Sequence, residues 1–264
     1  MILKYVLAAI GSATLSFAAV ASPQSVQLAV RLHAGERIVK RSDLVDRVQW
    51  VLPPARLAAF AAQGAVINEE IRTTIVASGS VASTTSRAAK ITGTIATTVR
   101  DVPRKRVTTS HTAGASVVTS RNAEVGTTVY ELEGASMVDL PTGEVQMGSR
   151  WTTHQRVLTT LGSGNATFEH VVAAIEDGRV RVDIIGTGAI TGKEYNLPKL
   201  LPGTIHLQGS AWFDPATGLV NQESYHIENT LVKLAGNDQI GFIERMDAEL
   251  SLTKKDVQRR KSQI

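Results

Sequence analysis

The C-terminal third of the chain alternates between apolar and polar residues. From Thr204 to Phe213, apolar or small side chains fall on every second position, while His206 and Trp212 belong to the other face. This period of two predicts a strand that buries one face. Leu219 to Val232 and Gln239 to Thr253 show the same alternation, so we expect an antiparallel meander of three strands.

The period of two extends over most of the chain, whereas the helical period of 3.6 is nearly absent. Further strands are predicted at Ser25 to His33, Arg37 to Val51, Arg72 to Val118 with a break at Asp101 to Arg106, Thr167 to Glu176 and Arg179 to Ile190. Residues 34–36 and 177–178 are expected to close hairpins. Pro53 to Gln63 is the predicted helix, because prolines open it and Gly64 follows it. The fold class is therefore all-β: a strongly curved antiparallel sheet, a half-barrel or open barrel, with one short helix.

Residues 1–21 have the layout of a secretory signal peptide. Lys4 precedes an apolar run, and Ala19-Val20-Ala21 supplies the small residues of a cleavage site. The run of about 16 apolar residues is shorter than the roughly 20 that a membrane-spanning helix needs. We therefore expect cleavage after residue 21 and a periplasmic or secreted mature protein without a transmembrane segment.

Residues 22–253 are expected to form a single β-rich domain, either continuous or built from two similar units that meet near residues 125–140. Residues 254–264 hold five Lys and Arg against one Asp, so this basic tail carries +4 and leaves about −1 on the domain. The tail is either solvated or in contact with an anionic envelope surface. Expected export and the lack of a basic stripe interleaved with aromatic residues argue against a nucleic-acid partner. The lack of cysteine excludes disulfides and thiolate metal sites.

Two segments of the chain echo each other. Leu140-Pro141 through Gly148-Ser149 to Trp151 matches Leu201-Pro202 through Gly209-Ser210 to Trp212, with five identities at an offset of 61 residues. This echo reflects either a duplicated strand unit or a coincidence. Gly148 and Trp151, followed by the turn of Asp214, Thr217 and Gly218, resemble the Gly-Ser-x-Trp and Asp-x-x-Thr-Gly motifs of an exported bacterial β-rich family of unknown function. The resemblance covers roughly residues 130 to 253 and implies a curved sheet similar in shape to LolA-type carriers, with no catalytic residue.

His206 and His226 are the candidate metal ligands. If the apolar faces of their strands coincide, Phe213 lies opposite Leu219 and His206 lies directly opposite His226. Imidazoles at opposed positions are close enough to share a metal ion, with Glu228 or Glu169 as a third ligand. The alternative is that both histidines are ordinary residues of a polar face.

The concave face of the predicted sheet is the candidate ligand site. Such a face can hold a lipid or another apolar small molecule against the helix, without a cofactor. The candidate lining residues are Leu57, Phe60, Leu207, Phe213, Tyr225 and Ile227. The same residues are equally expected in an ordinary core.

Three functions remain open at this level. The preferred one is a non-catalytic binding module for an apolar ligand or an envelope component. The others are a structural envelope protein that binds other proteins through strand edges, and a metal-dependent hydrolase that uses His206 and His226. The sequence does not decide whether the protein is an enzyme, but it favours a non-catalytic role.

Overall fold

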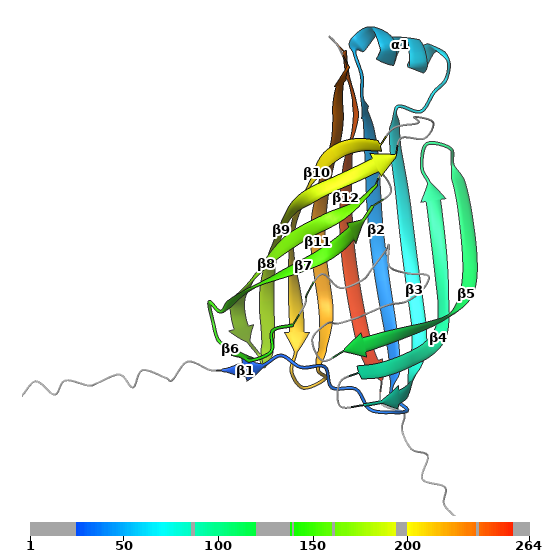
Figure 1. The fold of residues 1–264 in the computed structure, drawn as a ribbon. Coiled ribbons are helices and arrows are strands. Elements are labelled where there is room, and N and C mark those ends of the chain that lie inside the picture. The colour runs from blue at the N-terminus through cyan, green and yellow to red at the C-terminus, as the bar shows by residue number, and fades with distance from the viewer. Residues whose placement is uncertain are drawn as a thin grey trace, which may run out of the picture.

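A computed structural model describes residues 25–85, 88–119, 138, 140–159, 162–193, 200–235 and 238–255 of the chain. These residues form one long-stranded sheet, a second sheet of two very short strands, and a helix (Figure 1). In chain order the elements are β1 (Val26–Gln27), β2 (Arg37–Val51), α1 (Pro54–Ala62), β3 (Asn68–Thr84), β4 (Ala88–Asp101), β5 (Arg106–Thr119), β6 (Glu144–Val145), β7 (Arg150–Leu158), β8 (Gly162–Glu176), β9 (Arg179–Lys193), β10 (Leu200–Asp214), β11 (Leu219–Ala235) and β12 (Asp238–Lys255).

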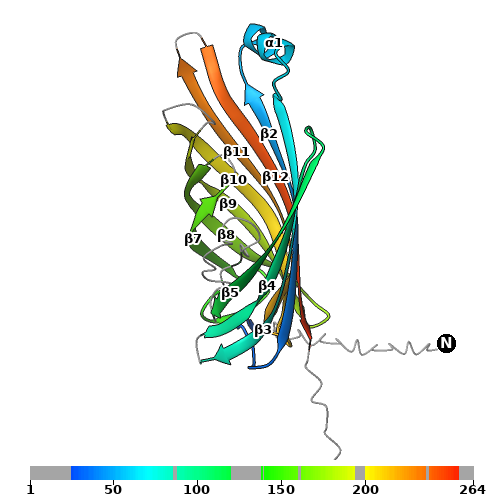
Figure 2. The same ribbon diagram turned by 90° about the vertical axis from the view of Figure 1, so that its right-hand side faces the viewer.

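The large sheet contains ten antiparallel strands in the order β5-β4-β3-β2-β12-β11-β10-β9-β8-β7. The four strands β2–β5 and the six strands β7–β12 join where β2 pairs with β12, so strands from the two ends of the chain lie side by side inside the sheet. Among the described strands, β5 and β7 end the sheet and do not pair with each other. Figure 1 and Figure 2 show that the sheet is strongly curved. The predicted all-β class, with an open curved sheet and one short helix, is confirmed.

Helix α1 connects β2 to β3 and agrees closely with the prediction. Pro53 occupies the N-cap position, and the chain leaves the helix through Gly64 at a φ of 75°. The helix lies beyond the ends of β2 and β3 rather than over the concave face (Figure 1). None of its residues is buried, and no helix in the described part of the chain is long and apolar enough to cross a membrane.

The hairpin of β8 and β9 turns at Asp177 and Gly178, as predicted. Both residues have positive φ, 50° and 74° respectively. This is the conformation of a type I′ turn, whose twist matches that of the flanking strands.

The predicted hairpin between Ser25–His33 and Arg37–Val51 is wrong. Within the first segment only β1 is a strand, and it pairs with β6. The reason is that β2 is already paired on both sides, with β3 and β12, and has no free edge for the preceding segment. The segment instead runs across the end of the sheet (Figure 1), where Arg31 contacts the β10–β11 turn at Gly218 and the alternation of the segment buries Leu28 and Leu32.

The main core lies on the concave face of the large sheet. Side chains there are covered in part by residues of the β1 and β6 region, namely Leu28, Val138, Leu140 and Val145. A smaller cluster combines Leu32, Ile38, Val81, Ala89 and Leu219. The burial pattern of β12 alternates along most of its length, so its opposite face points to solvent. The convex face is therefore polar, whereas the concave face carries the apolar core together with a few buried polar side chains, such as the hydrogen-bonded pair Asn229 and Glu244.

The echo between the two Leu-Pro segments does not reflect equal structures. Gly148 has a φ of 80° in the turn before β7, whereas Gly209 lies inside β10, close to Tyr225. The region near residues 125–140, where two similar units could meet, lies almost entirely outside the described residues.

Candidate functional site on the convex face

The pairing of β10 with β11 differs from the predicted register by one position next to the loop and by two positions from Trp212 to Gly203. Phe213 pairs with Val220 rather than with Leu219, and His206 pairs with Glu228 rather than with His226. His226 lies opposite Gln208. The two histidines share the convex face but are diagonal neighbours, not a directly opposed pair.

Two local features of the hairpin cause this shift. The loop spans only residues 215–218, because Asp214 already pairs with Leu219. The pairing then shifts again between Trp212 and Phe213, where Asn221 forms a bulge. Each feature moves the register by one residue, and together they move it by two. An even shift keeps every side chain on its predicted face.

The Asp214 side chain determines the short loop. Its Oδ1 accepts a hydrogen bond from the Ala216 N–H at 2.8 Å, and its Oδ2 accepts one from the Thr217 hydroxyl at 3.0 Å. Gly218 has a φ of 69°, and a Cβ at this position would meet the backbone nitrogen of Arg31. The Asp-x-x-Thr-Gly motif is therefore a turn against which the segment before β2 packs.

The observed register removes the arrangement on which the metal hypothesis depends. Glu228, opposite His206, accepts a hydrogen bond from Arg245, and His226 contacts Asp247 instead of His206. Glu169 lies on β8, separated from β10 by the whole of β9. Within the described residues, no group of three or more His, Asp or Glu side chains is arranged to hold a metal ion.

The six apolar candidates do not form one surface. Leu207, Phe213, Tyr225 and Ile227 are all at most 5% exposed and belong to the main core. Leu57 is half-buried and Phe60 is exposed, on a helix beyond the opposite end of the sheet from Phe213. Phe60 contacts Trp50 edge to face, with the ring centroids 5.7 Å apart. The structure thus places the four strand residues in a packed core, separate from the helix.

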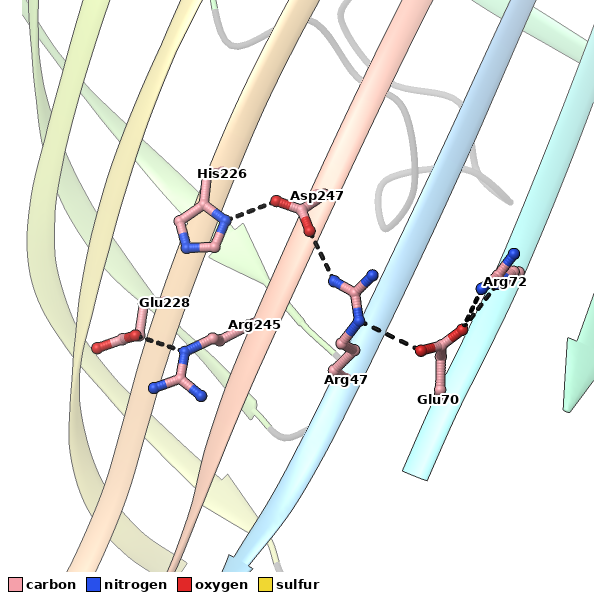
Figure 3. A network of polar contacts seen from close by, with 7 residues as sticks. All are labelled: Arg47, Glu70, Arg72, His226, Glu228, Arg245 and Asp247. Atoms are coloured by element: carbon pink, nitrogen blue, oxygen red, sulfur yellow. Dashed lines mark hydrogen bonds and ion pairs between the residues drawn. The ribbon is translucent and has the colours of Figure 1, made fainter. Parts of the chain in front are cut away.

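A network of charged side chains crosses the convex face over four neighbouring strands (Figure 3). Asp247 lies at its centre, because Oδ1 is 2.7 Å from Nδ1 of His226 and Oδ2 accepts a hydrogen bond from Nη1 of Arg47 at 2.7 Å. Arg47 also donates to Glu70 at 3.3 Å, and Glu70 accepts a shorter bond of 2.7 Å from Arg72. The network ties β11, β12, β2 and β3 together across their solvent face.

These contacts shift the pKa values of the carboxyl groups. The pKa of Asp247 lies below its ordinary value, mainly because of the hydrogen bond from His226, and Arg47 adds to this effect against the opposing effect of burial. The pKa of Glu70 is also lowered, chiefly by its hydrogen bond from Arg72. Both groups are therefore anionic at neutral pH.

Beside this network the convex face is hollowed into a groove of about 780 Å³. The hollow follows from side-chain size. Ser210 and Ser224 pair directly across β10 and β11, so two small residues lie side by side. Larger side chains flank them in the neighbouring rows, Gln208 and His226 on one side and Trp212 on the other. A second hollow of about 450 Å³ continues past Trp212 and shares both serines with the first.

Carboxylates lie at both ends of the serine row. Asp183 pairs with Ser210 on one side, and Glu249 pairs with Ser224 on the other. The next residue in the row is Asp43, directly opposite Glu249 on β2. Because like charges at directly opposed positions repel, this pair is unfavourable without a positive group nearby.

The charges of the groove are only partly balanced. Arg41 donates to Asp43 at 2.6 Å and lowers the pKa of that carboxyl, while Arg181 donates to Asp183 at 2.9 Å. Glu249 has no ion pair with any described residue. The groove therefore offers fixed hydrogen-bond acceptors, two hydroxyl groups and one uncompensated carboxylate.

Sequence reasoning placed His226 and His206 on the polar face but did not find the groove. Its residues come from five strands, and only the register aligns the two serines. The available signal was small polar residues at outward positions of adjacent strands. That signal becomes informative only when the loop and the bulge are known.

The sequence matches no family model and no curated protein. Among solved structures, Pseudomonas aeruginosa OpdQ is similar with a TM-score of 0.33 and 6% identity, over 83% of this chain and 98% of that one. OccK5 (OpdH) of the same organism gives 0.32 and 7%, over 85% and 100%. An outer membrane channel from Pseudomonas putida F1 gives 0.24 and 10%, over 85% and 97%. At these scores the similarity supports no inference about fold or function.

Proposed function

We propose that the protein is an exported, non-catalytic binding module whose ligand site is the groove on the convex face. The ligand class that fits is a polar molecule with hydroxyl groups and at least one cationic amine. Glu249 carries this proposal, because its carboxylate faces Asp43, lacks an ion pair within the described residues and lines the groove. An ammonium group beside Glu249 would give this carboxylate the cation that Arg41 already gives Asp43.

Export rests on the sequence of residues 1–21, and the resemblance to an exported β-rich family supports the same location. The mature protein would then bind its ligand in the periplasm or outside the cell. Binding through a preformed groove needs no chemical step, since hydrogen bonds and charge contacts alone fix the ligand.

The groove is preferred over the concave face for a geometric reason. An apolar ligand on the concave face would have to displace side chains that cover Leu207, Phe213, Tyr225 and Ile227, all of which are packed. The groove is accessible without any such rearrangement. A rearranged concave face remains the alternative site, with a lipid as its ligand.

Calorimetric titration of the mature protein with three probes tests the proposal. Spermidine represents a cationic ligand, glucose an uncharged polyol and palmitate an apolar chain. We expect spermidine to bind, and Glu249→Gln to weaken its binding by about tenfold, or ~1.4 kcal/mol. Ser224→Tyr should also weaken binding by filling the groove. Glu169→Gln, which removes an exposed convex-face carboxylate outside the groove, is the matched control.

The outcomes separate the two sites. Palmitate binding that is unchanged by Glu249→Gln and Ser224→Tyr would overturn the groove proposal and favour the concave face. Equal losses of spermidine binding in Glu249→Gln and Glu169→Gln would show that general charge, not the groove, is responsible.

A further inference from the structure

Strand β5 ends the large sheet, and the side chains of its first eight residues are exposed on both faces. All side chains from Arg106 to Ala113 are exposed, including Val107 at 55%. One edge of β5 pairs with β4 over its full length, and the other edge has no partner among the described strands. Every second backbone N–H and C=O of β5 therefore points away from the sheet.

Within the described residues, this edge lacks the features that normally prevent strand edges from pairing. Natural edge strands are short, twisted by bulges, or carry charged residues and proline. After Arg106, β5 continues for 13 residues without Lys, Arg, Asp, Glu or Pro. Its pairing with β4 contains no register shift.

The other end of the sheet differs in these respects. Strand β7 has only nine residues and carries Arg150 and Arg156. Its Trp151 is stacked on the buried His170, with the ring centroids 5.0 Å apart. The two edges of one sheet are therefore unequal, and β5 is the one suited to accept a further strand.

We propose that β5 pairs in antiparallel fashion with β5 of a second copy of this chain. The proposal is independent of the groove on the convex face, which is lined by residues of β2, β12, β11, β10 and β9 and by none of β3, β4 or β5. A two-fold axis perpendicular to the sheet joins the two edges into one continuous sheet of twenty strands, twice the ten of one copy.

Geometry limits the register of this pairing. Directly opposed residues of two antiparallel strands point to the same face of the sheet. The two-fold axis, which lies midway between the strands, must therefore be level with one residue that faces its own copy, and not level with a peptide bond between two residues. The longest registers pair thirteen of the fourteen residues of β5, with the axis at Thr112 or at Ala113. Thirteen opposed positions supply about thirteen backbone hydrogen bonds, since an antiparallel ladder has close to one per residue pair.

The charge of β5 is compatible with self-pairing. Arg106 is at one end of the strand, so antiparallel pairing holds the two copies of this residue about 40 Å apart. No like charges then meet across the interface. Pairing of β5 with β7 of another copy would instead bring Arg150 and Arg156 to the junction and produce an open chain of molecules rather than a closed dimer.

Sedimentation of the mature protein at micromolar concentration tests this inference. We expect a dimer for the natural sequence. The double substitution Thr112→Lys and Ala113→Lys should give a folded monomer, because like charges then lie opposite each other at whichever residue occupies the axis. The double substitution Thr112→Asp and Ala113→Asp should also give a monomer. Mixing the two variants should restore a dimer containing one copy of each.

The matched control adds two lysines to the other edge through Thr152→Lys and His154→Lys, both at exposed positions of β7. This variant should remain dimeric. Far-UV circular dichroism confirms that each variant is folded. A monomeric natural protein, a dimer that survives the β5 charges, or a failure of the mixture to form heterodimers would each overturn the proposal.

Discussion

Lys254, at the end of β12, lies 2.7 Å from Glu36, just before β2. The contact joins Nζ of Lys254 to Oε1 of Glu36, and the two side chains are only 12% and 13% exposed. Lys254 had been expected to begin a basic tail, but Lys254 and Lys255 are the last residues of β12. The remaining tail, residues 256–264, lies outside the described residues, and its contact with an anionic surface stays a prediction.

Removing either partner of this ion pair should destabilise the protein. Lys254→Met leaves a largely buried Glu36 without its cation, and Glu36→Gln leaves the lysine unpaired. We expect each to lower the free energy of unfolding by about 2 kcal/mol, as for other hydrogen bonds to charged groups. Urea unfolding of both single variants and the double variant measures the coupling, and additive effects would contradict a direct interaction.

Glu36 should also make the protein sensitive to acid. Burial alone would raise its pKa, but the hydrogen bonds from Lys254 and from the backbone and ring of His33 outweigh burial and lower the pKa below the ordinary value of 4.5. The unfolded chain therefore binds this proton more readily than the folded one. The stabilisation is complete above pH 4.5 and is lost as the pH falls through the lower, folded pKa. The destabilisation by Glu36→Gln, measured in urea, should consequently be smaller at pH 3 than at pH 7.

The β8–β9 turn allows a test of backbone conformation alone. A Cβ at Gly178 would meet no atom within 4 Å, but the residue has a φ of 74°. Gly178→Ala should therefore cost about 1 kcal/mol of unfolding free energy through the left-handed backbone. Gly143 is equally open but does not have positive φ. Gly143→Ala should change stability by less than about 0.5 kcal/mol in thermal unfolding, and equal effects of the two substitutions would refute this explanation.

Gly186 provides the opposite case, in which space and not backbone conformation requires glycine. It lies between Phe168 and Leu207 in one row of the concave face, and a Cβ there would approach the Phe168 ring to 2.7 Å. Because Phe168 is fully buried, its ring has little room to move. Gly186→Ala should destabilise the protein by about 1–3 kcal/mol. Adding Phe168→Leu should recover part of that loss, and purely additive effects in chemical denaturation would contradict the proposed clash.

The sequence predicted the strands themselves better than it predicted which strands pair with each other. Alternation identified the strands of the C-terminal meander and the face of each residue, because the period of two is a property of one strand. It did not reveal that β2 pairs with β12, since alternation carries no information about partners far away in the chain. The same limit explains the wrong N-terminal hairpin, where Leu28 and Leu32 alternate as cover for the core.

The predicted register between His206 and His226 was wrong because of two local features, a turn and a bulge. His206 and His226 were placed on the correct face, but their separation depended on the Asp214 turn and the Asn221 bulge. A bulge has no reliable signal in a polar strand, because its extra residue is as polar as its neighbours. The groove between Ser210 and Ser224 was missed for the same reason.

His226 should act on Asp247 rather than on a metal ion. The hydrogen bond from His226 is the main cause of the lowered pKa of Asp247, so His226→Ala should move that pKa up toward its ordinary value of 3.8. The folded-state pKa is depressed, so the linked stabilisation is present above pH 3.8 and is lost as the pH falls through the lower value. Since both side chains are about half exposed, the effect on stability should stay below about 1 kcal/mol.

Carbon-detected NMR titration of the Asp247 carboxyl measures the shift directly. His206→Ala is the control, because His206 pairs with Glu228 and should leave the Asp247 titration unchanged. An Asp247 pKa that responds equally to both substitutions would show that a diffuse field, rather than the 2.7 Å contact, lowers it.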